Sequence, residues 1–276
     1  MSKIIAFTNQ KGGVGKTTSS VNVALSLAVS EVKTLLIDLD PQSNATTGLA
    51  ELISETKGNV YDVMLKGNGA SEVISNTSFH HLDIITSTTD LVGAEIELVN
   101  IMAREYQLQK ALKNIKKKYD IIIIDCPPSL GLLTINALTA SDALVIPIQC
   151  EYYALEGLGQ LLNTVRLVQR HLNKSLEITG ILMTMYDGRL NLSKQVVSEV
   201  DSFFKEKLFA RKNAYSSGFY AKATGELTNL SIKTKKDLTK ETETIGGIQI
   251  TCSACGILTV ETDPNKLIFI PSLTIG

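Results

Sequence analysis

The segment Lys11–Thr18, KGGVGKTT, constrains the fold more than any other part of this 276-residue chain. It stands between an apolar run at Lys3–Thr8, typical of a buried strand, and a stretch of helical periodicity at Thr17–Val29. Its glycines let backbone N–H groups approach a phosphate closely, and the start of the helix directs its positive dipole end at the same point. The segment therefore predicts a phosphate-binding loop between a strand and a helix of an α/β fold.

This loop departs from the common pattern G-x-x-x-x-G-K-[ST] at its beginning. Gln10 stands where the first glycine is expected, and Lys11 adds a second lysine. Lys16 is placed to neutralise phosphate charge, and the Thr17 hydroxyl is placed to bind Mg²⁺. The alternatives are a glycine turn without a ligand and, for Lys11, a solvated surface lysine. The residues expected to bind the nucleotide are Lys11, Gly12, Gly13, Val14, Gly15, Lys16, Thr17 and Thr18.

Short apolar runs alternate with helical stretches through residue 209. Runs such as IIIID are apolar on both faces, which is typical of strands covered by helices on each side. The alternation predicts a doubly wound, mostly parallel α/β sheet. Strands are expected at Lys3–Thr8, Lys33–Asp38, Leu82–Thr86, Tyr119–Asp125, Ala143–Ile148 and Glu177–Met183. Helices are expected at Thr17–Val29, Asp90–Lys117, Leu130–Thr139, Leu155–Leu172 and Asn191–Lys207.

The character of the chain changes after Phe209, where Thr, Ser, Gly and Lys dominate and no long helical period continues. This composition predicts short strands and turns. We therefore expect one α/β domain over residues 1–209 and a divergent segment over residues 210–276. That segment contains Cys252 and Cys255, which supply half of a tetrahedral zinc site. Zinc shared between two such segments and thiols without metal are the alternatives.

Composition excludes several classes of protein. The apolar fraction of 44% and the net charge of -1 are ordinary for a globular protein and argue against a broadly basic nucleic-acid-binding surface. The four cysteines are too few and too scattered for a disulfide scaffold. No apolar run approaches the roughly 20 residues that span a bilayer. We expect a reduced, cytoplasmic protein that does not contact the membrane.

Three acidic residues follow apolar strands near the predicted loop. Asp38 and Asp40 end one strand in LLIDLDPQSNAT, and Asp125 ends another in IIIIDCPPS. Ligands of doubly wound sheets bind at the carboxyl ends of the strands, so these side chains are expected around the loop. Carboxylates in this position can hold Mg²⁺ directly or through water. The alternative is that they are turn residues at strand ends.

Residues 1–209 resemble the ParA/Soj chromosome- and plasmid-partitioning ATPases, the deviant Walker A branch of the P-loop NTPases. The resemblance rests on KGGVGKTT, LLIDLDPQSNATTGL, VGAEIEL, YDIIIIDCPPSLGLLTINALTASD, VIPIQCEYYALEGL and MYDGRLNLSKQV. It implies that ATP and Mg²⁺ are bound in a sandwich dimer of two chains. After Phe209 the sequence no longer matches the family, whose closing segments contribute adenine contacts and further DNA contacts.

The same resemblance implies a role for each site residue. Lys11 would reach the phosphates bound by the partner chain, and Lys16 would bind the nucleotide of its own chain. Asp40 would orient the attacking water. Asp125 would hold Mg²⁺ through its water shell, with Asp38 in a supporting position. These roles make Lys11, Lys16 and Asp40 the catalytic candidates. Thr17 and Asp125 are the candidates for binding the metal.

Arg189, in YDGRLNL, stands where the family carries a DNA-contacting arginine. With neighbours such as Lys194 it could contact phosphates without reading sequence; the alternative is a solvated loop charge. The run Lys116–Lys118 ends a predicted helix and is interpreted as a solvated helix end. Cys126 and Cys150 are interpreted as small buried residues, the alternative being an iron–sulfur cluster shared by two subunits as in nitrogenase iron protein.

The resemblance implies a cytoplasmic, nucleoid-associated ATPase that dimerises with ATP and binds DNA non-specifically. A ParB/Spo0J-like centromere-binding partner would reset it by stimulating hydrolysis. One alternative is a non-catalytic nucleotide-binding switch or scaffold. Another is a membrane-associated positioning ATPase of the MinD type, which needs a basic amphipathic helix near the C-terminus. The segment NKLIFIPSLTIG contains a proline and has no helical face.

Overall fold

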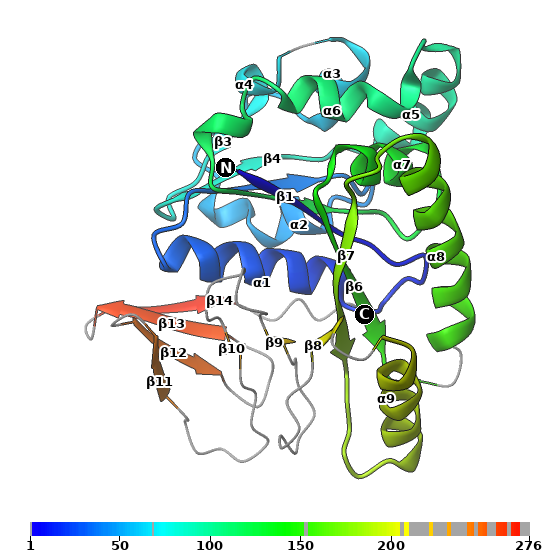
Figure 1. The fold of residues 1–276 in the computed structure, drawn as a ribbon. Coiled ribbons are helices and arrows are strands. Elements are labelled where there is room, and N and C mark those ends of the chain that lie inside the picture. Colours follow the sequence, from blue (N-terminus) through cyan, green and yellow to red (C-terminus); the bar gives the residue numbers. More distant parts are fainter. Residues whose placement is uncertain are drawn as a thin grey trace.

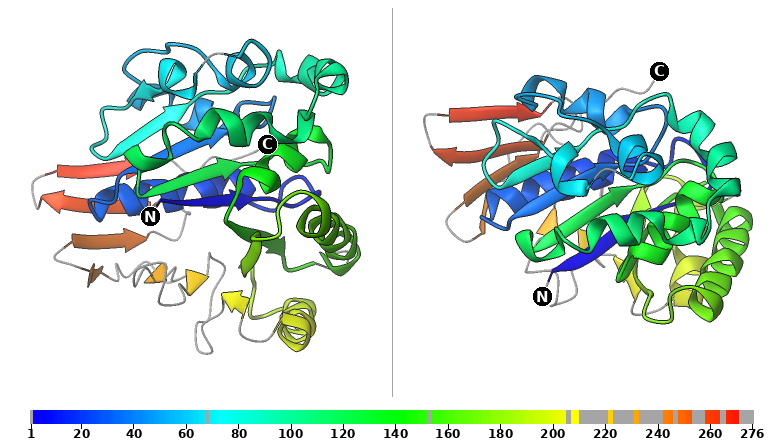
Figure 2. Two further views of the ribbon diagram at one scale, coloured as in Figure 1. Left: turned by 45° about the horizontal axis from the view of Figure 1, so that its top comes forward. Right: turned by 90° about the horizontal axis from the view of Figure 1, so that it is seen from above.

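The computed structural model describes residues 2–67, 69–151, 154–204 and 207–209, and six short strands beyond residue 209. The main sheet has the strand order β3-β4-β2-β5-β1-β6-β7-β8, and every neighbouring pair is parallel except β3 and β4. Helices lie on both faces of this sheet (Figures 1 and 2). The predicted doubly wound, mostly parallel α/β sheet is confirmed.

The sheet strands are β1 (Lys3–Phe7), β2 (Thr34–Asp38), β3 (Ser75–Asn76), β4 (Leu82–Ile85), β5 (Ile121–Asp125), β6 (Ala143–Gln149), β7 (Glu177–Thr184) and β8 (Leu208–Phe209). The α-helices are α1 (Lys16–Val29), α2 (Asn44–Gly48), α3 (Val60–Leu65), α4 (Ala70–Val73), α5 (Leu91–Glu97), α6 (Gln107–Leu112), α7 (Leu132–Ala140), α8 (Ala154–His171) and α9 (Asn191–Phe204). Short 3-10 helices are η1 (Ala50–Leu52), η2 (Leu98–Asn100), η3 (Arg104–Tyr106) and η4 (Lys116–Lys118).

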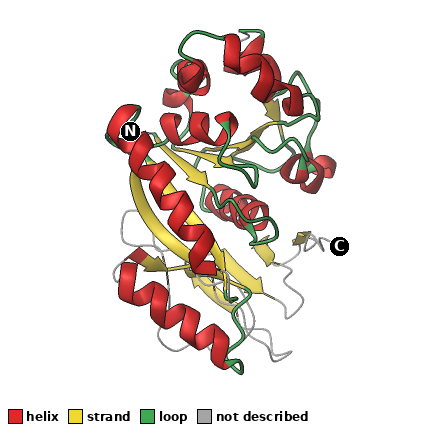
Figure 3. Cartoon of the chain, turned by 90° about the vertical axis from the view of Figure 1, so that its right-hand side faces the viewer, coloured by secondary structure: helices red, strands yellow, loops and turns green. Residues whose placement is uncertain are grey.

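The central strands are apolar on both faces because each face packs against its own layer of helices. In β1, Ile5 and Phe7 join a core cluster with α1, whereas Ile4 and Ala6 join a second cluster that includes residues of α3 and α5 to α9. This is the alternation of a strand whose neighbouring side chains point to opposite faces. Figure 3 shows the twisted sheet between these two layers.

The register of the central strands brings their carboxyl ends level with one another. Phe7 in β1 and Asp38 in β2 both pair with Asp125, the last residue of β5. The loop that follows β1 therefore starts at the same edge of the sheet as the two acidic residues. We call this the carboxyl edge of the sheet.

One predicted helix is wrong: residues 90–117 do not form a single helix. The chain forms α5 and η2, turns at Ala103 with a left-handed φ of 54°, and continues through η3 and α6. Asn136 of α7 stabilises the break, because its side chain donates to the Arg104 carbonyl at 2.8 Å and accepts from the Leu108 amide at 3.2 Å. The short helices α2, α3 and α4 and the edge strands β3 and β8 were not predicted.

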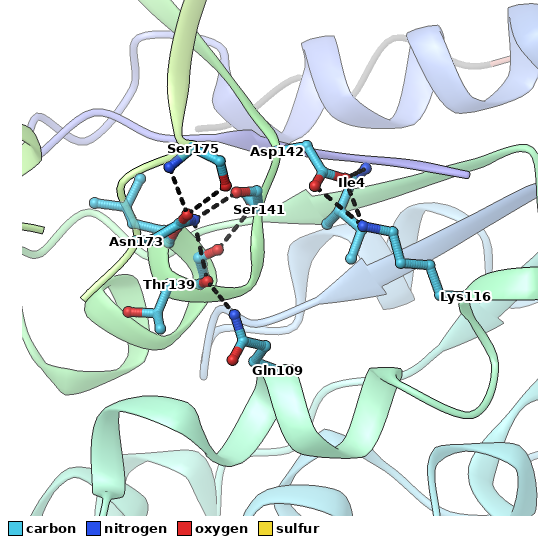
Figure 4. Close-up of polar contacts among 10 residues, drawn as sticks. Ile4, Gln109, Lys116, Thr139, Ser141, Asp142, Asn173 and Ser175 are labelled. Carbon is cyan, nitrogen blue, oxygen red and sulfur yellow. Dashed lines mark hydrogen bonds and ion pairs between the residues drawn. The ribbon is translucent and has the colours of Figure 1, made fainter. Parts of the chain in front are cut away.

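The opposite ends of the strands, where β6 and β7 begin, carry the polar network drawn in Figure 4. The buried Asn173 amide donates to the carbonyl oxygens of Leu138, Thr139 and Ser141 at 2.7 to 3.1 Å, which fixes the turn between α7 and β6. Lys116 pairs with Asp142 at 2.8 Å. Lys116 is therefore not the purely solvated helix end that was predicted.

Beyond residue 209 the described strands form two antiparallel groups. One contains β9 (Ala221–Lys222) and β10 (Ser231–Ile232). The other contains β11 (Thr242–Ile245), β12 (Ile248–Cys252), β13 (Leu258–Asp263) and β14 (Lys266–Ile270). Cys255 and the Cys252 side chain lie outside the described residues, as does the zinc site predicted on them. No helix in the described part of the chain is long and apolar enough to cross a membrane.

Candidate functional site

The glycine loop lies at the carboxyl edge and has open space where a phosphate is expected. Gly13 and Gly15 adopt left-handed φ values of 74° and 84°, which favour glycine. A Cβ added at Gly12 or Gly13 would meet no atom within 4 Å. Gly15 directly precedes the first turn of α1, and no described side chain caps this helix start. The loop thus leaves the helix N-terminus open to an anion.

The loop is anchored from both flanks by residues that sequence analysis did not single out. The Thr184 hydroxyl, at the end of β7, donates to the Val14 carbonyl at 2.8 Å. The Asn9 side chain accepts from the Lys11 amide at 3.1 Å and donates to the Pro147 carbonyl at 2.7 Å. Both side chains are buried, so the loop is held before any ligand arrives. Asn9 was the easier one to find, since it directly precedes the loop in TNQKGG.

The two lysines of the loop have different surroundings. Lys16 is buried, and its ammonium group donates to the Lys11 carbonyl at 2.9 Å. Burial lowers the pKa of Lys16, while the charges of Asp125 and Asp40 act in the opposite direction. The side chain of Lys11 is 38% exposed, and its ammonium group forms an ion pair with Glu151, two residues after β6. Only Lys16 therefore faces the interior of the loop.

Asp125 is the least satisfied polar side chain of the site. It is fully buried, and neither carboxyl oxygen has a hydrogen-bond partner among the described residues. Burial, and next the charge of Asp38, raise the pKa of Asp125 to about 8, although the hydroxyls of Thr17 and Ser20 lie close enough to oppose this. A buried carboxylate without partners is rare and costly. Its position near Thr17 suits a hydrated Mg²⁺, which prefers oxygen ligands.

Asp38 and Asp40 hold the turn that follows β2. Asp38 accepts hydrogen bonds from the amide and hydroxyl of Thr46, each at 2.8 Å, and from the Asp40 amide at 3.1 Å. Burial raises the pKa of Asp38 to about 6. Asp40 is also buried, and its carboxylate accepts from the Gln42 amide at 2.9 Å. Asp38 therefore fixes the position of Asp40 at the carboxyl edge.

Four further predicted residues lie outside the loop itself, although Cys126 directly follows Asp125 and Cys150 directly precedes Glu151. Arg189 is on the segment between β7 and α9, where its side chain is 73% exposed and pairs with Asp187 at 2.5 Å. Lys194 is exposed on α9. Cys126 and Cys150 are buried in the core, and burial raises the pKa of the Cys150 thiol to about 12. These two cysteines thus pack as small apolar residues.

A further contact links α5 to the loop after β5. A Cβ added at Gly131 would lie 2.0 Å from Oε1 of Glu95, so the Glu95 carboxylate rests directly against this glycine. The same oxygen is buried and has no hydrogen-bond partner among the described residues. Gly131 directly precedes α7 and lies six residues after Asp125. From the sequence, Glu95 was noted only as part of the motif VGAEIEL, and Gly131 only as part of the motif YDIIIIDCPPSLGLLTINALTASD.

Comparison with known proteins decides the family. A family model described as "AAA domain" matches residues 2–178. The chain is 57% identical over 209 residues to the sporulation initiation inhibitor protein Soj of Bacillus subtilis, covering 76% of this chain and 83% of that protein. It is 51% identical over 207 residues to the chromosome partitioning protein ParA of Myxococcus xanthus, covering 75% and 73%. The chain belongs to the ParA/Soj family of chromosome-partitioning ATPases.

Solved structures share the fold of this ParA/Soj protein. Cobyrinic acid a,c-diamide synthase from Mycobacterium smegmatis, with bound ADP and magnesium, is 38% identical with a TM-score of 0.69, covering 74% of this chain and 83% of that one. A putative plasmid partition protein from Borrelia burgdorferi, bound to AMPPNP, is 27% identical with a TM-score of 0.67, covering 85% and 92%. The family resemblance predicted from the sequence is confirmed.

Proposed function

We propose that this ParA/Soj protein hydrolyses ATP with Mg²⁺ in a sandwich dimer of two chains, and that the dimer binds DNA non-specifically. A centromere-binding, ParB-like partner would stimulate hydrolysis and release the dimer. The observation that carries the proposal is the pair of lysines in one loop. Lys16 is buried within it, whereas Lys11 is partly exposed and held from outside by Glu151. Relatives named Soj and ParA, and similar structures with ADP or AMPPNP bound, support it.

Each group near the loop has a chemical role in this proposal. The amides of residues 12–18 and the Lys16 ammonium group bind the phosphates, and Thr17 and Asp125 hold Mg²⁺, Asp125 through its water shell. A bound Mg²⁺ would supply charge neutralisation at the phosphate oxygens. Asp40 accepts a hydrogen bond from the attacking water and orients it, while Asp38 holds Asp40 through its backbone amide. Positioning and charge stabilisation are what phosphoryl transfer requires.

Lys11 serves the neighbouring chain. A lysine from a second chain can stabilise the charge on the transferred phosphoryl group, as an arginine finger does, and such a finger raises rates by about 10³ to 10⁵ in GTPases. Lys11 must leave Glu151 to do so. Turnover is therefore expected to be slow until two chains meet.

Arg189 and Lys194 supply the DNA contacts, since both side chains are exposed near the start of α9. Contacts of this kind go to phosphates, carry no sequence information and weaken steeply with salt. A protein with this activity would be cytoplasmic and associated with the nucleoid. Residues 266–270 form strand β14 and give no support to the MinD-like alternative, which needs an amphipathic helix.

Four single variants test the proposal by size-exclusion chromatography, ATP turnover and DNA retention. Lys16→Ala should lose nucleotide binding. Lys11→Ala should bind ATP as a monomer, and Asp40→Ala should dimerise without hydrolysis. Arg189→Ala should dimerise but lose salt-sensitive retention on DNA, whereas Lys174→Ala, which removes another exposed lysine, should behave as the wild type. Dimerisation of Lys11→Ala at the wild-type ATP concentration would contradict the role of Lys11, and dimers without turnover in the wild type would favour the non-catalytic switch.

A further inference from the structure

A second concave site lies at the amino ends of the strands, on the side of the sheet away from the glycine loop. It is a cavity of about 630 Å³ formed where β2, β4 and β5 begin. Lys33 precedes β2, the segment Thr77–Asp83 leads into β4, and the segment Lys117–Tyr119 precedes β5. Strand β5 has 5 residues, which places the two sites about 17 Å apart. A ligand in this cavity would therefore not touch the loop.

The cavity concentrates positive charge in a chain whose net charge is -1. Three lysines and two histidines line it, and all five side chains are exposed: Lys33, Lys117, Lys118, His80 and His81. These two are among only three histidines in the sequence. No ion pair engages the three lysines within the described part of the chain. The cavity is thus suited to an anion.

The carboxylate that lines the cavity is already engaged. The Asp83 carboxylate accepts hydrogen bonds from the Tyr119 hydroxyl at 2.8 Å and from the side-chain amide of Asn76 at 2.9 Å. Its hydrogen bond to Tyr119, together with burial, raises the pKa of that phenol, with burial the larger cause. The Tyr119 ring is thereby fixed in the cavity wall. The Asp83 carboxylate is therefore occupied by Tyr119 and Asn76 and does not pair with the lysines of the cavity.

The loop that presents the histidines is rigidly built. The Thr77 hydroxyl donates toward the carbonyl oxygens of Phe79 and Leu82, at 3.1 and 2.7 Å, and accepts from the Phe79 amide at 3.2 Å. His81 has a left-handed φ of 64°, uncommon for a residue other than glycine, and its carbonyl accepts from the Thr34 amide at 2.8 Å. Non-glycine residues in this conformation gather at ligand sites. The backbone that carries the two exposed histidines is therefore fixed before a ligand binds.

We infer that this cavity binds a small phosphorylated molecule that carries a ring, such as a nucleotide. The lysines and histidines would contact the phosphates, and Tyr119 and Phe79, which line the same cavity, would contact the ring. The volume falls within the range of about 300 to 1,000 Å³ that small-molecule sites occupy. A concave site of this size fits a small anion better than the broad backbone of a DNA duplex. The inference does not depend on the function proposed for the loop.

The histidines make the test direct, because each gives its own imidazole proton signals in NMR. Full-length protein in EDTA is titrated with ADP as the probe, and His171, at the end of α8, is the internal control. Signals of His80 and His81 should shift and saturate, while the signal of His171 stays. The same shifts should persist in Lys16→Ala, in which the glycine loop no longer binds nucleotide.

Charge reversal distinguishes a real site from a remote response. Lys33→Glu with Lys117→Glu should weaken the binding that the histidines report by about tenfold or more, whereas Lys174→Glu should leave it unchanged. Lys33→Gln with Lys117→Gln should give a smaller loss and guards against misfolding of the reversed variant. Unmoved His80 and His81 signals, or shifts that disappear in Lys16→Ala, would overturn the inference. So would a short DNA duplex that shifts these signals where ADP does not.

Discussion

Replacing Asp125 by asparagine should stabilise the protein in the absence of ligands, most strongly at high pH. Asp125 is fully buried at the end of β5, and its pKa is raised from 3.8 to about 8 by burial and by Asp38. Between these two values the folded chain holds one proton that the unfolded chain has released. An acid with a raised pKa stabilises the fold fully below its unfolded value, and this contribution is lost as the pH rises through its folded value.

The slope of this effect follows from one proton. The free energy of unfolding should fall by about 1.4 kcal/mol for each pH unit over this range, or about 2 kcal/mol between pH 6 and pH 7.5. Asp38 adds to the slope mainly below pH 6, since its pKa is raised only to about 6. Asp125→Asn removes the Asp125 contribution because the amide cannot ionise. Magnesium with nucleotide should also flatten the wild-type slope, because a cation favours the ionised carboxylate.

Urea unfolding in EDTA at pH 6.0, 6.75 and 7.5 measures this slope. The wild type should lose stability with rising pH relative to Asp125→Asn, and the variant should be the more stable protein at pH 7.5. Asp201→Asn, which removes an exposed carboxylate on α9, should keep the wild-type slope. Equal slopes for wild type and Asp125→Asn would refute the reasoning. A variant less stable than the wild type in EDTA at pH 7.5 would refute it as well.

Three further substitutions give distinct expectations. Glu151→Gln should release Lys11 and lower the ATP concentration at which half of the chains dimerise, by up to about fivefold. The reason is that a partly exposed ion pair contributes about 0 to 1 kcal/mol. A higher midpoint, measured by light scattering, would contradict this. Gly13→Ala should lower stability by about 1 to 2 kcal/mol, since φ is 74°, while Gly12→Ala should not; thermal unfolding separates the two. Asn173→Ala should lower the free energy of unfolding by about 1 to 3 kcal/mol, measured in urea, because three carbonyl oxygens lose their donor. Asn163→Ala, at an exposed position, should leave the stability unchanged.

Six of the eight strands of the main sheet were predictable from the sequence to within two residues at each end, because each is an apolar run bounded by polar residues. The predicted strand Glu177–Met183, for example, corresponds to β7 at Glu177–Thr184. Residues 90–117 were not predictable in this way. Their apolar positions fit one helical period, but the chain turns at Ala103 because Asn136, from a helix later in the chain, bonds to Arg104 and Leu108. Tertiary contacts overrode the local pattern there.

In the candidate site, too, local sequence identified some residues, and others depend on tertiary contacts. Lys16, Asp38 and Asp125 were identified because each begins or ends a regular element, and parallel strands place such residues at one edge. The partners that hold the site come from distant parts of the chain: Thr184 bonds to Val14 across 170 positions. Nothing in the local sequence links such residues. Their roles emerge only once the sheet order is known.

The two lysines of the loop are physically connected, and under the proposed function this connection would relate nucleotide binding to pairing of the chains. The Lys16 ammonium group donates to the carbonyl of Lys11, while the Lys11 side chain pairs with Glu151. Phosphates in the loop would draw Lys16 away from that carbonyl, because a doubly charged anion is a stronger acceptor than a peptide oxygen. The backbone at Lys11 would lose this contact at the moment its side chain is needed by a partner chain. Under the proposed function, occupation of one site would thus loosen the residue that completes the other, and a bound nucleotide would favour dimerisation.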